Sequence, residues 1–294
     1  SWTTPLMVVF GFGFCITAFI GYKGLEMLSR FAVPAMIILV AVSMTIATSD
    51  AGGFSGLLAI TPSDEMTVAA AITMVFGTFV SGGTQATNWT RFAKSGKTAV
   101  IATLLAFFLG NGLMTLIGAF GALVYQQADI VDIMVAQGLA TLGILMLFLN
   151  LWTTQDNTVY NFAVAGCNMI RTRRRKLVTV GGAAIGTVLA VLGMYEWLIP
   201  FLVLLGTFIP PIGGVIMASY FIGYKREYPS LETATLPAFN IPGLAAYAIG
   251  SAAAYTSPWI APIVGVLVAA ASYGVVLVVS EAVRDRRAQV LGAV

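Results

Sequence analysis

The sequence is dominated by apolar runs that are long enough to cross a lipid bilayer. A membrane-spanning helix needs about 20 mostly apolar residues. Only 9% of the 294 residues are charged, and 59% are hydrophobic. We therefore predict an all-α integral membrane protein, with a short interfacial helix at 129–137. The expected spans are 5–22, 32–48, 67–87, 99–124, 138–168, 177–194, 197–222, 241–256 and 260–280.

The charges alternate between successive loops. All 15 Lys and Arg residues follow the first, third, fifth, seventh and ninth spans. In the loops after the even-numbered spans, every charged residue is Asp or Glu. Basic loops stay on the cytoplasmic side. We therefore expect the carboxy-terminal segment 284–294 to be a cytoplasmic tail and Ser1 to lie on the outer side. The basic run at 171–176 is interpreted as an anchor at the membrane lipid, not as a nucleic-acid site.

The chain begins at the mouth of a span, without an initiating Met or a polar leader. Nine spans with an outer amino terminus suggest that an odd number of spans is missing. We therefore expect this chain to be the carboxy-terminal part of a longer protein.

The residue types argue against an enzyme. The chain has no His, and its two Cys, Cys15 and Cys167, have no metal-binding spacing. An intramembrane enzyme would need an acid–base pair or a metal at depth, so we expect no catalytic residues and no cofactor. A channel is the other alternative. It predicts polar residues lining several helices, whereas here they gather in two patches.

The first polar patch lies in the span 138–168. At about 100° per residue, five of its side chains share one helical stripe about 100° wide: Asn150, Thr153, Thr154, Asn157 and Asn161. Such oxygens suit a Na⁺ site; the alternative is hydrogen bonding between helices. The register of five residues favours a site. Asp156 lies on the opposite side, and it either acts in transport or links to a neighbouring helix.

The second patch, at 75–89, is rich in glycine. Gly77, Gly82 and Gly83 surround Phe79. Such a run predicts either a helix interrupted within the membrane, which exposes backbone groups to a solute, or a close helix–helix contact. Two further irregularities are expected: a kink at Pro210–Pro211 and, more weakly, one at 110–112.

Several motifs together resemble one transporter family. They read "FVSGGTQATNWTRFAKSGKTAV", "AFFLGNGLM", "DIVDIMVAQGL", "LNLWTTQDN" and "IPPIGGVIM", and they resemble the cytosine permeases of the nucleobase–cation symport family. The resemblance implies a leucine-transporter-type fold with two inverted five-helix repeats. Here 1–48 would be the last two helices of the first repeat, 67–222 the second repeat and 241–283 two peripheral helices. The first three helices of the family would be missing partners of this chain.

The same resemblance implies a function and a site. It implies a symporter that uses Na⁺ as its coupling ion and imports cytosine across the cytoplasmic membrane by alternating access. Uracil, allantoin or a hydantoin remain alternative solutes. The interrupted helix matches Gly77–Gly83. Phe79 would stack on the base, and Thr78 and Ser81 lie beside it. The Na⁺ ligands would be Asn150, Thr153 and Thr154, with Asn150 also near the substrate. One departure is Ser219, where those permeases carry an aspartate.

Overall fold

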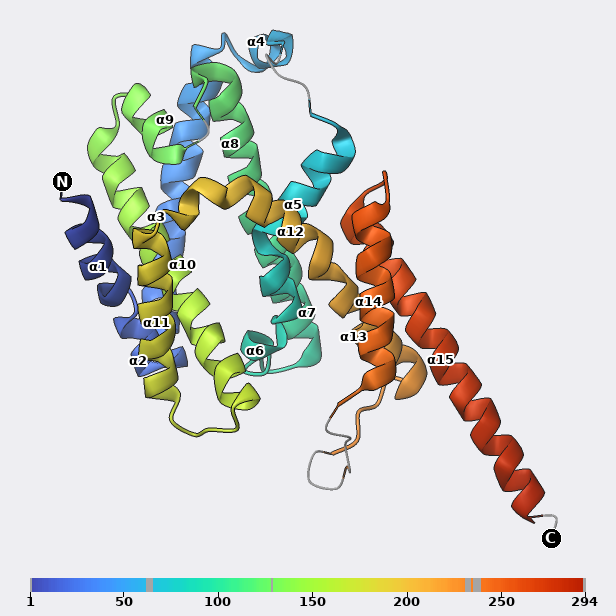
Figure 1. Ribbon diagram of the computed structural model, residues 1–294. Helices are drawn as coiled ribbons and strands as arrows, with labels where there is room; N and C mark the ends of the chain where they lie inside the picture. Colours follow the sequence, from blue (N-terminus) through green and yellow to red (C-terminus); the bar gives the residue numbers. More distant parts are fainter. Residues whose placement is uncertain (1, 62–65, 128, 231–233, 235–238, 293–294) are drawn as a thin grey trace. The chain divides into compact units, whose positions relative to one another are not determined.

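The computed structural model describes residues 2–61, 66–127, 129–230, 234 and 239–292. Every regular element in these ranges is a helix (Figure 1). In chain order they are α1 (Thr3–Gly13), α2 (Ile16–Ile20), α3 (Tyr22–Asp50), α4 (Phe54–Ala59), α5 (Val68–Thr84), α6 (Thr87–Thr90), α7 (Gly96–Leu105), the π-helix η1 (Ala106–Asn111), α8 (Gly112–Tyr125), α9 (Ile130–Ala136), α10 (Ala140–Met169), α11 (Arg175–Val191), the 3₁₀-helix η2 (Met194–Trp197), α12 (Leu198–Phe208), α13 (Pro210–Ala218), the π-helix η3 (Ser219–Gly223), α14 (Ile241–Thr256) and α15 (Ala261–Gly292).

Several helices begin where the sequence supplies a capping side chain. Thr67, Ser95, Asp129 and Asn240 each accept a hydrogen bond from a backbone N–H in the first turn of α5, α7, α9 and α14. Such caps satisfy amides that have no partner within the helix.

The chain divides into two compact units. Unit 1 comprises residues 1–65 and 88–196, and unit 2 comprises residues 66–87 and 197–294. The predicted repeat boundaries are a different kind of division, and they stay a prediction.

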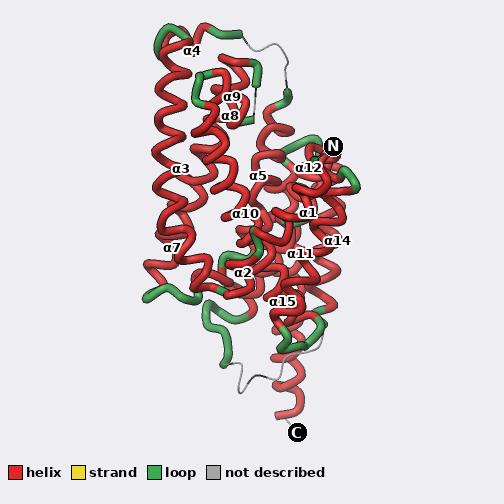
Figure 2. Tube along the Cα trace, turned by 90° about the vertical axis from the view of Figure 1, so that its left-hand side faces the viewer, coloured by secondary structure: helices red, strands yellow, loops and turns green. Residues whose placement is uncertain are grey.

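Helix α10 organises unit 1. It packs against α2, α3, α9 and α11, and α3 runs as one long helix beside α8 (Figure 2). One buried apolar cluster joins α10 to α2, α3 and α11: Cys15, Ala18, Leu25, Val159, Tyr160 and Ala183. A second joins it to α3, α8 and α9: Leu39, Val40, Ile117, Met134 and Met146. These clusters fix the position of the polar residues of α10.

Unit 2 is held by close contacts at small residues. Helix α15 packs along α13 and α14. At Gly214 an added Cβ would lie 2.3 Å from the backbone oxygen of Val266, and at Gly250 it would lie 2.6 Å from the Cβ of Ala269. Such small-residue contacts are typical of helices that pack in lipid.

The predicted spans are confirmed as helices. Within the described residues, six helical segments are long and apolar enough to cross a membrane. Helices α11 and α14 have 17 and 16 residues. Helix α10 has 30 residues, but its polar run lowers its mean hydropathy. The expected short helix before α10 is present as α9, whose Ile133 and Met134 are fully buried.

Two predicted irregularities are confirmed. Helix α12 ends at Phe208, and α13 begins at Pro210 with the prolines in its first turn, because proline can be accommodated at that position. Residues 106–111 form a π-helix. At Ser219, which departs from the aspartate of the resembled permeases, the chain enters a second π-helix and stays helical.

The predicted interruption at Gly77–Gly83 is wrong for this structure. Helix α5 is continuous from Val68 to Thr84, and the chain turns at residues 85–86 instead. The cause is packing. A Cβ at Gly77 would lie 2.0 Å from the carbonyl oxygen of Leu202, and one at Gly206 would lie 2.3 Å from that of Thr73. Gly77 therefore serves a close contact between α5 and α12, which was the alternative interpretation.

Two boundaries differ from expectation. The first span is broken at residues 14–15, between α1 and α2. Helix α15 continues to Gly292, so most of the expected tail 284–294 is helical.

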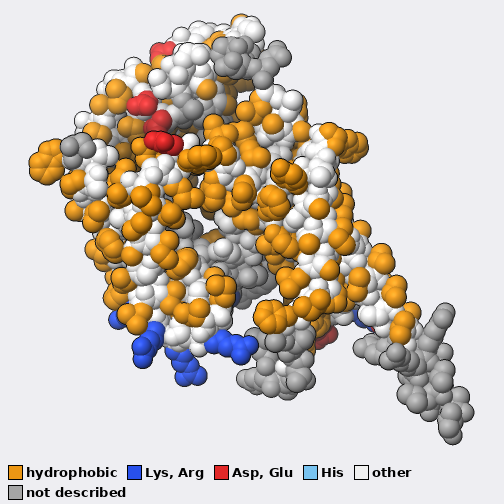
Figure 3. All heavy atoms as spheres, viewed as in Figure 1, with side chains coloured by type: hydrophobic (Ala, Val, Ile, Leu, Met, Phe, Trp, Pro, Cys, Tyr) orange, Lys and Arg blue, Asp and Glu red, His pale blue; other side chains and the backbone are white. Residues whose placement is uncertain are grey.

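Charges separate to opposite ends of unit 1. In Figure 3, the Lys and Arg side chains of this unit gather below α10 and α11, and acidic side chains gather at the other end. This separation agrees with the alternation of loops seen in the sequence. The predicted outer position of Ser1 falls outside the described residues.

Candidate functional site

The polar stripe of α10 divides into two parts, and the first part is open. Asn150 is half-buried and Thr154 is exposed, and among the described residues neither side chain makes a hydrogen bond. The Thr153 hydroxyl donates to the backbone oxygen of Leu149 at 2.9 Å. That bond directs its hydrogen at the backbone and leaves oxygen lone pairs available. These three side chains therefore present oxygen atoms that a cation could accept as ligands.

The second part of the stripe is used for structure. Nε1 of Trp89 donates to Oδ1 of Asn157 at 2.9 Å, and Nδ2 of Asn88 donates to Oδ1 of Asn161 at 3.1 Å. Arg91 also reaches α10, where its guanidinium donates to the Tyr160 hydroxyl at 3.2 Å. Asn157 and Asn161 therefore anchor the segment 88–91 to α10. The sequence placed all five polar residues in one register, but only the fold separates the two roles.

The opposite side of α10 holds the break between α1 and α2. Nε1 of Trp152 donates to the Thr17 hydroxyl at 3.1 Å, and Nε2 of Gln155 donates to the Gly11 carbonyl at 2.6 Å. A helix that ends inside the protein leaves carbonyl and amide groups to be satisfied. Gln155 satisfies one such carbonyl near the end of α1, and Trp152 bonds to a side chain in α2. Sequence reasoning missed both contacts because α1 and α2 were expected as one helix.

Asp156 belongs to the same contact. Its side chain is 1% exposed, and it faces Thr17 and the backbone of Ala18 at the first turn of α2. The amino-terminal end of a helix favours a negative group. Neither carboxyl oxygen has a hydrogen-bond partner of normal length in the described part of the chain. Asp156 therefore lies buried between α10 and α2, and it is not part of the open stripe.

The predicted base-contacting residues lie on α5, in unit 2. The side chain of Phe79 is 40% exposed, and its ring lies against the backbone of Gly82. At about 100° per residue, Phe79 is about 160° from the face on which Gly77 meets α12. Its ring is thus directed away from that contact, which fits a ring that faces a solute and equally one that faces lipid.

The neighbours of Phe79 are less well aligned with it. The Thr78 hydroxyl donates to the backbone oxygen of Val75 at 2.6 Å. In a continuous helix, Ser81 is about 160° from Phe79. The assignment of Thr78 and Ser81 to a solute stays a prediction, and for Ser81 it requires the end of α5 to unwind.

Among the described residues, no cluster of three or more Cys, Asp or Glu side chains could hold a metal ion. The oxygen atoms of the open stripe are hydroxyl and amide oxygens, which suit a weakly held monovalent cation better than a transition metal.

Taken together, the long apolar helices, the break at Pro210 and the oxygen-rich stripe of α10 are typical of a membrane transport protein. Residues 1–276 match the family model described as permease for cytosine/purines, uracil, thiamine, allantoin. The chain belongs to this family. The family and its relatives are permeases, so the chain is grouped with transporters and not with enzymes.

The curated relatives are bacterial. The chain is 38% identical over 268 residues to the cytosine permease of Escherichia coli O157:H7 and to that of strain K12. Each alignment covers 91% of this chain and 63% of the relative, so the chain spans less than two thirds of their length.

A solved structure shows the fold. Mhp1, a nucleobase-cation-symport-1 family transporter in a closed conformation with bromovinylhydantoin bound, matches with a TM-score of 0.73 at 19% identity. The match covers 90% of this chain and 65% of Mhp1. It confirms the leucine-transporter-type fold class that the motifs implied.

Proposed function

We propose that the protein is a Na⁺-coupled permease that imports cytosine across the cytoplasmic membrane by alternating access. The observation that carries the proposal is the open part of the α10 stripe. Asn150, Thr153 and Thr154 present oxygens on one helical face, and the neighbouring polar residues are already used in hydrogen bonds. Na⁺ sites of secondary transporters are built from such oxygens and completed by backbone carbonyls.

Phe79 is the proposed stacking residue for the base. Stacking of a base on an aromatic ring contributes about 1–3 kcal/mol, and the partly exposed ring of Phe79 offers a flat apolar face. Thr78, Ser81 and Asn150 are the proposed hydrogen-bonding residues. The cytosine assignment is supported by the names of the E. coli relatives.

Coupling needs no covalent chemistry. If Na⁺ and the base favour the same conformations, each raises the affinity for the other by the same factor. Downhill Na⁺ entry then drives uptake of the base. The basic end of unit 1 is proposed to face the cytoplasm.

Counterflow by the full-length protein in liposomes tests the substrate. Vesicles are loaded with unlabelled cytosine, uracil, allantoin or a hydantoin, and exchange with external labelled cytosine is measured in Na⁺ and in K⁺. We expect cytosine to drive the fastest exchange, and only in Na⁺. Faster exchange with another solute would indicate that this solute, and not cytosine, is the substrate. An exchange rate in K⁺ equal to that in Na⁺ would refute the sodium coupling.

A further inference from the structure

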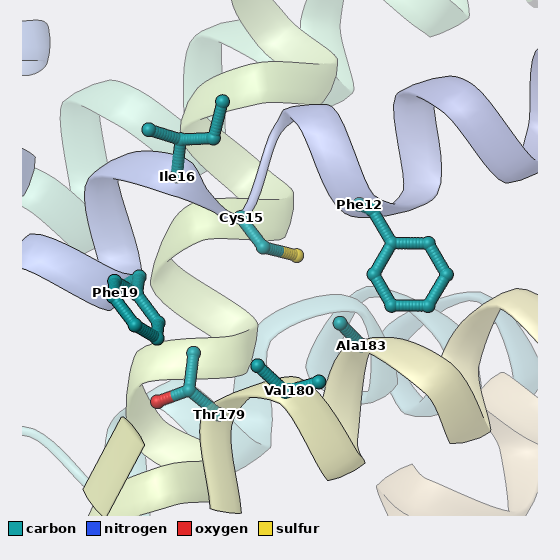
Figure 4. A pocket seen from close by; sticks show the side chains of 7 residues that line it. All are labelled: Phe12, Cys15, Ile16, Phe19, Thr179, Val180 and Ala183. Carbon is teal, nitrogen blue, oxygen red and sulfur yellow. The ribbon is translucent and has the colours of Figure 1, made fainter. Parts of the chain in front are cut away.

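A shallow groove opens on unit 1 at the break between α1 and α2. Its volume is about 160 Å³, and its two walls come from the α1–α2 segment and from α11 (Figure 4). The lining residues are Phe12, Cys15, Ile16, Phe19, Thr179, Val180 and Ala183.

The floor of the groove is made of small side chains. Cys15, Thr179 and Ala183 are 5%, 1% and 2% exposed. Both polar groups of the floor are directed at the backbone: the Cys15 thiol donates to the Gly11 oxygen at 3.1 Å, and the Thr179 hydroxyl donates to the Arg175 oxygen at 3.0 Å. The floor therefore offers almost no hydrogen-bonding group to an occupant.

The rim of the groove is apolar and exposed. Phe12, Ile16, Phe19 and Val180 are 42%, 60%, 38% and 46% exposed. The α1–α2 segment is one of the apolar stretches long enough to cross a membrane. An apolar groove of this kind matches a hydrocarbon chain, and filling it would remove unpacked surface.

One end of the groove is basic. Nζ of Lys176 lies 5.0 Å from the centre of the Phe19 ring, and Lys176 is one helical turn before Val180. Arg173 and Arg174 precede it and are exposed. Arg175 is already engaged, because its guanidinium donates to the carbonyl oxygens of Ala18, Phe19 and Ile20. The remaining cations carry no acidic partner in the described ranges.

We propose that this groove binds an anionic phospholipid, with part of one acyl chain between Phe19 and Val180 and the headgroup phosphate at Lys176. The apolar floor matches the chain, and the basic end matches the phosphate. Charge complementarity favours an anionic lipid over a second copy of the protein as the occupant, because the basic end of a second copy would be repelled.

Native mass spectrometry of the full-length protein in detergent tests the proposal. Binding of dioleoyl phosphatidylglycerol is compared with that of dioleoyl phosphatidylcholine, in the unchanged protein and in two variants. Lys176→Gln removes the charge, and Val180→Trp fills the groove. Lys97→Gln and Ile185→Trp are the matched controls, since both residues are exposed and lie on other surfaces.

We expect the unchanged protein to prefer phosphatidylglycerol, and Lys176→Gln to weaken that binding about fivefold, since one basic residue near the surface contributes about 1 kcal/mol. Val180→Trp should weaken both lipids, and the controls should change neither. Val180→Met serves as a milder filler if the Trp variant unfolds at a lower temperature.

Three results would overturn the proposal. The first is equal binding of the two lipids by the unchanged protein. The second is an equal loss in Lys176→Gln and Lys97→Gln. The third is that millimolar inorganic phosphate displaces phosphatidylglycerol equally well from the unchanged protein and from the groove variants. That result would indicate a site for free phosphate.

Discussion

The indole N–H of Trp89 donates a 2.9 Å hydrogen bond to the side-chain oxygen of Asn157. This contact separates the structural half of the α10 stripe from its open half. Asn157 also accepts a longer bond from Asn161, at 3.3 Å, so one amide oxygen serves two donors. The residues that remain open are Asn150, Thr153 and Thr154.

Replacing Asn157 should therefore affect stability more than ion binding. Asn157→Leu leaves the Trp89 N–H without its acceptor, which costs about 1–3 kcal/mol. We expect a lower unfolding temperature in detergent and an unchanged Na⁺ concentration for half-maximal cytosine uptake. Asn168→Ala is the control, because Asn168 is exposed on the same helix. A raised Na⁺ requirement at normal stability would place Asn157 in the ion site.

Asp156 should behave as a linking residue. Asp156→Asn keeps the size of the side chain and replaces the carboxyl beside the first turn of α2 with an amide. We expect the unfolding temperature to change, while the Na⁺ dependence of uptake stays as in the unchanged protein. Gln155→Ala, which removes the bond to Gly11, should act in the same way. Loss of uptake by a correctly folded Asp156→Asn protein would instead give the carboxyl a role in transport.

Gly77 should tolerate no side chain. In Gly77→Ala the new Cβ would lie 2.0 Å from the Leu202 oxygen, and overpacking of this kind costs about 1–3 kcal/mol. Gly213→Ala in α13 is the control, since nothing lies within 4 Å of the added Cβ. Thermal unfolding should show a loss for Gly77→Ala alone. Equal unfolding temperatures would contradict the tight α5–α12 contact.

Phe79 should act on the base and not on the ion. Phe79→Ala removes a stacking face contributing about 1–3 kcal/mol, so we expect the KM for cytosine to rise about tenfold with little change in the Na⁺ requirement. Phe79→Tyr keeps the ring and should stay near the original KM. An unchanged KM in Phe79→Ala would remove Phe79 from the proposed base contacts.

Much of the fold could be predicted from sequence because the bilayer restricts what a chain can form. Long apolar runs without strand-like alternation are expected to be helical there, and two adjacent prolines remove two helix hydrogen bonds, which favours a break at Pro210–Pro211. The charges of the loops then indicate the direction of each span.

Glycine and polar residues were harder to interpret, because the same residue type can serve either a functional site or the packing of helices. Gly77 fits both a broken helix and a close contact, and the carbonyl of Leu202, far away in sequence, decides between them. Asn157 and Asn150 occupy the same stripe, and only the position of Trp89 distinguishes them. The surroundings of Asp156 could not be predicted, because the break at residues 14–15 carries no proline and only a nearby glycine.

The Na⁺ dependence of cytosine uptake by Thr154→Ala tests whether the open part of the α10 stripe binds the ion. Thr158→Ala is the matched control, because Thr158 is exposed one turn further along α10 and its hydroxyl bonds to the backbone oxygen of Thr154. Both variants are made in the full-length protein, and Thr154→Ser is included because it keeps the hydroxyl.

We predict that Thr154→Ala raises the Na⁺ concentration for half-maximal uptake about tenfold, which corresponds to about 1.4 kcal/mol. Thr158→Ala and Thr154→Ser should stay close to the unchanged protein. An unchanged Na⁺ requirement in a well-folded Thr154→Ala protein would contradict the assignment of the α10 stripe as an ion site.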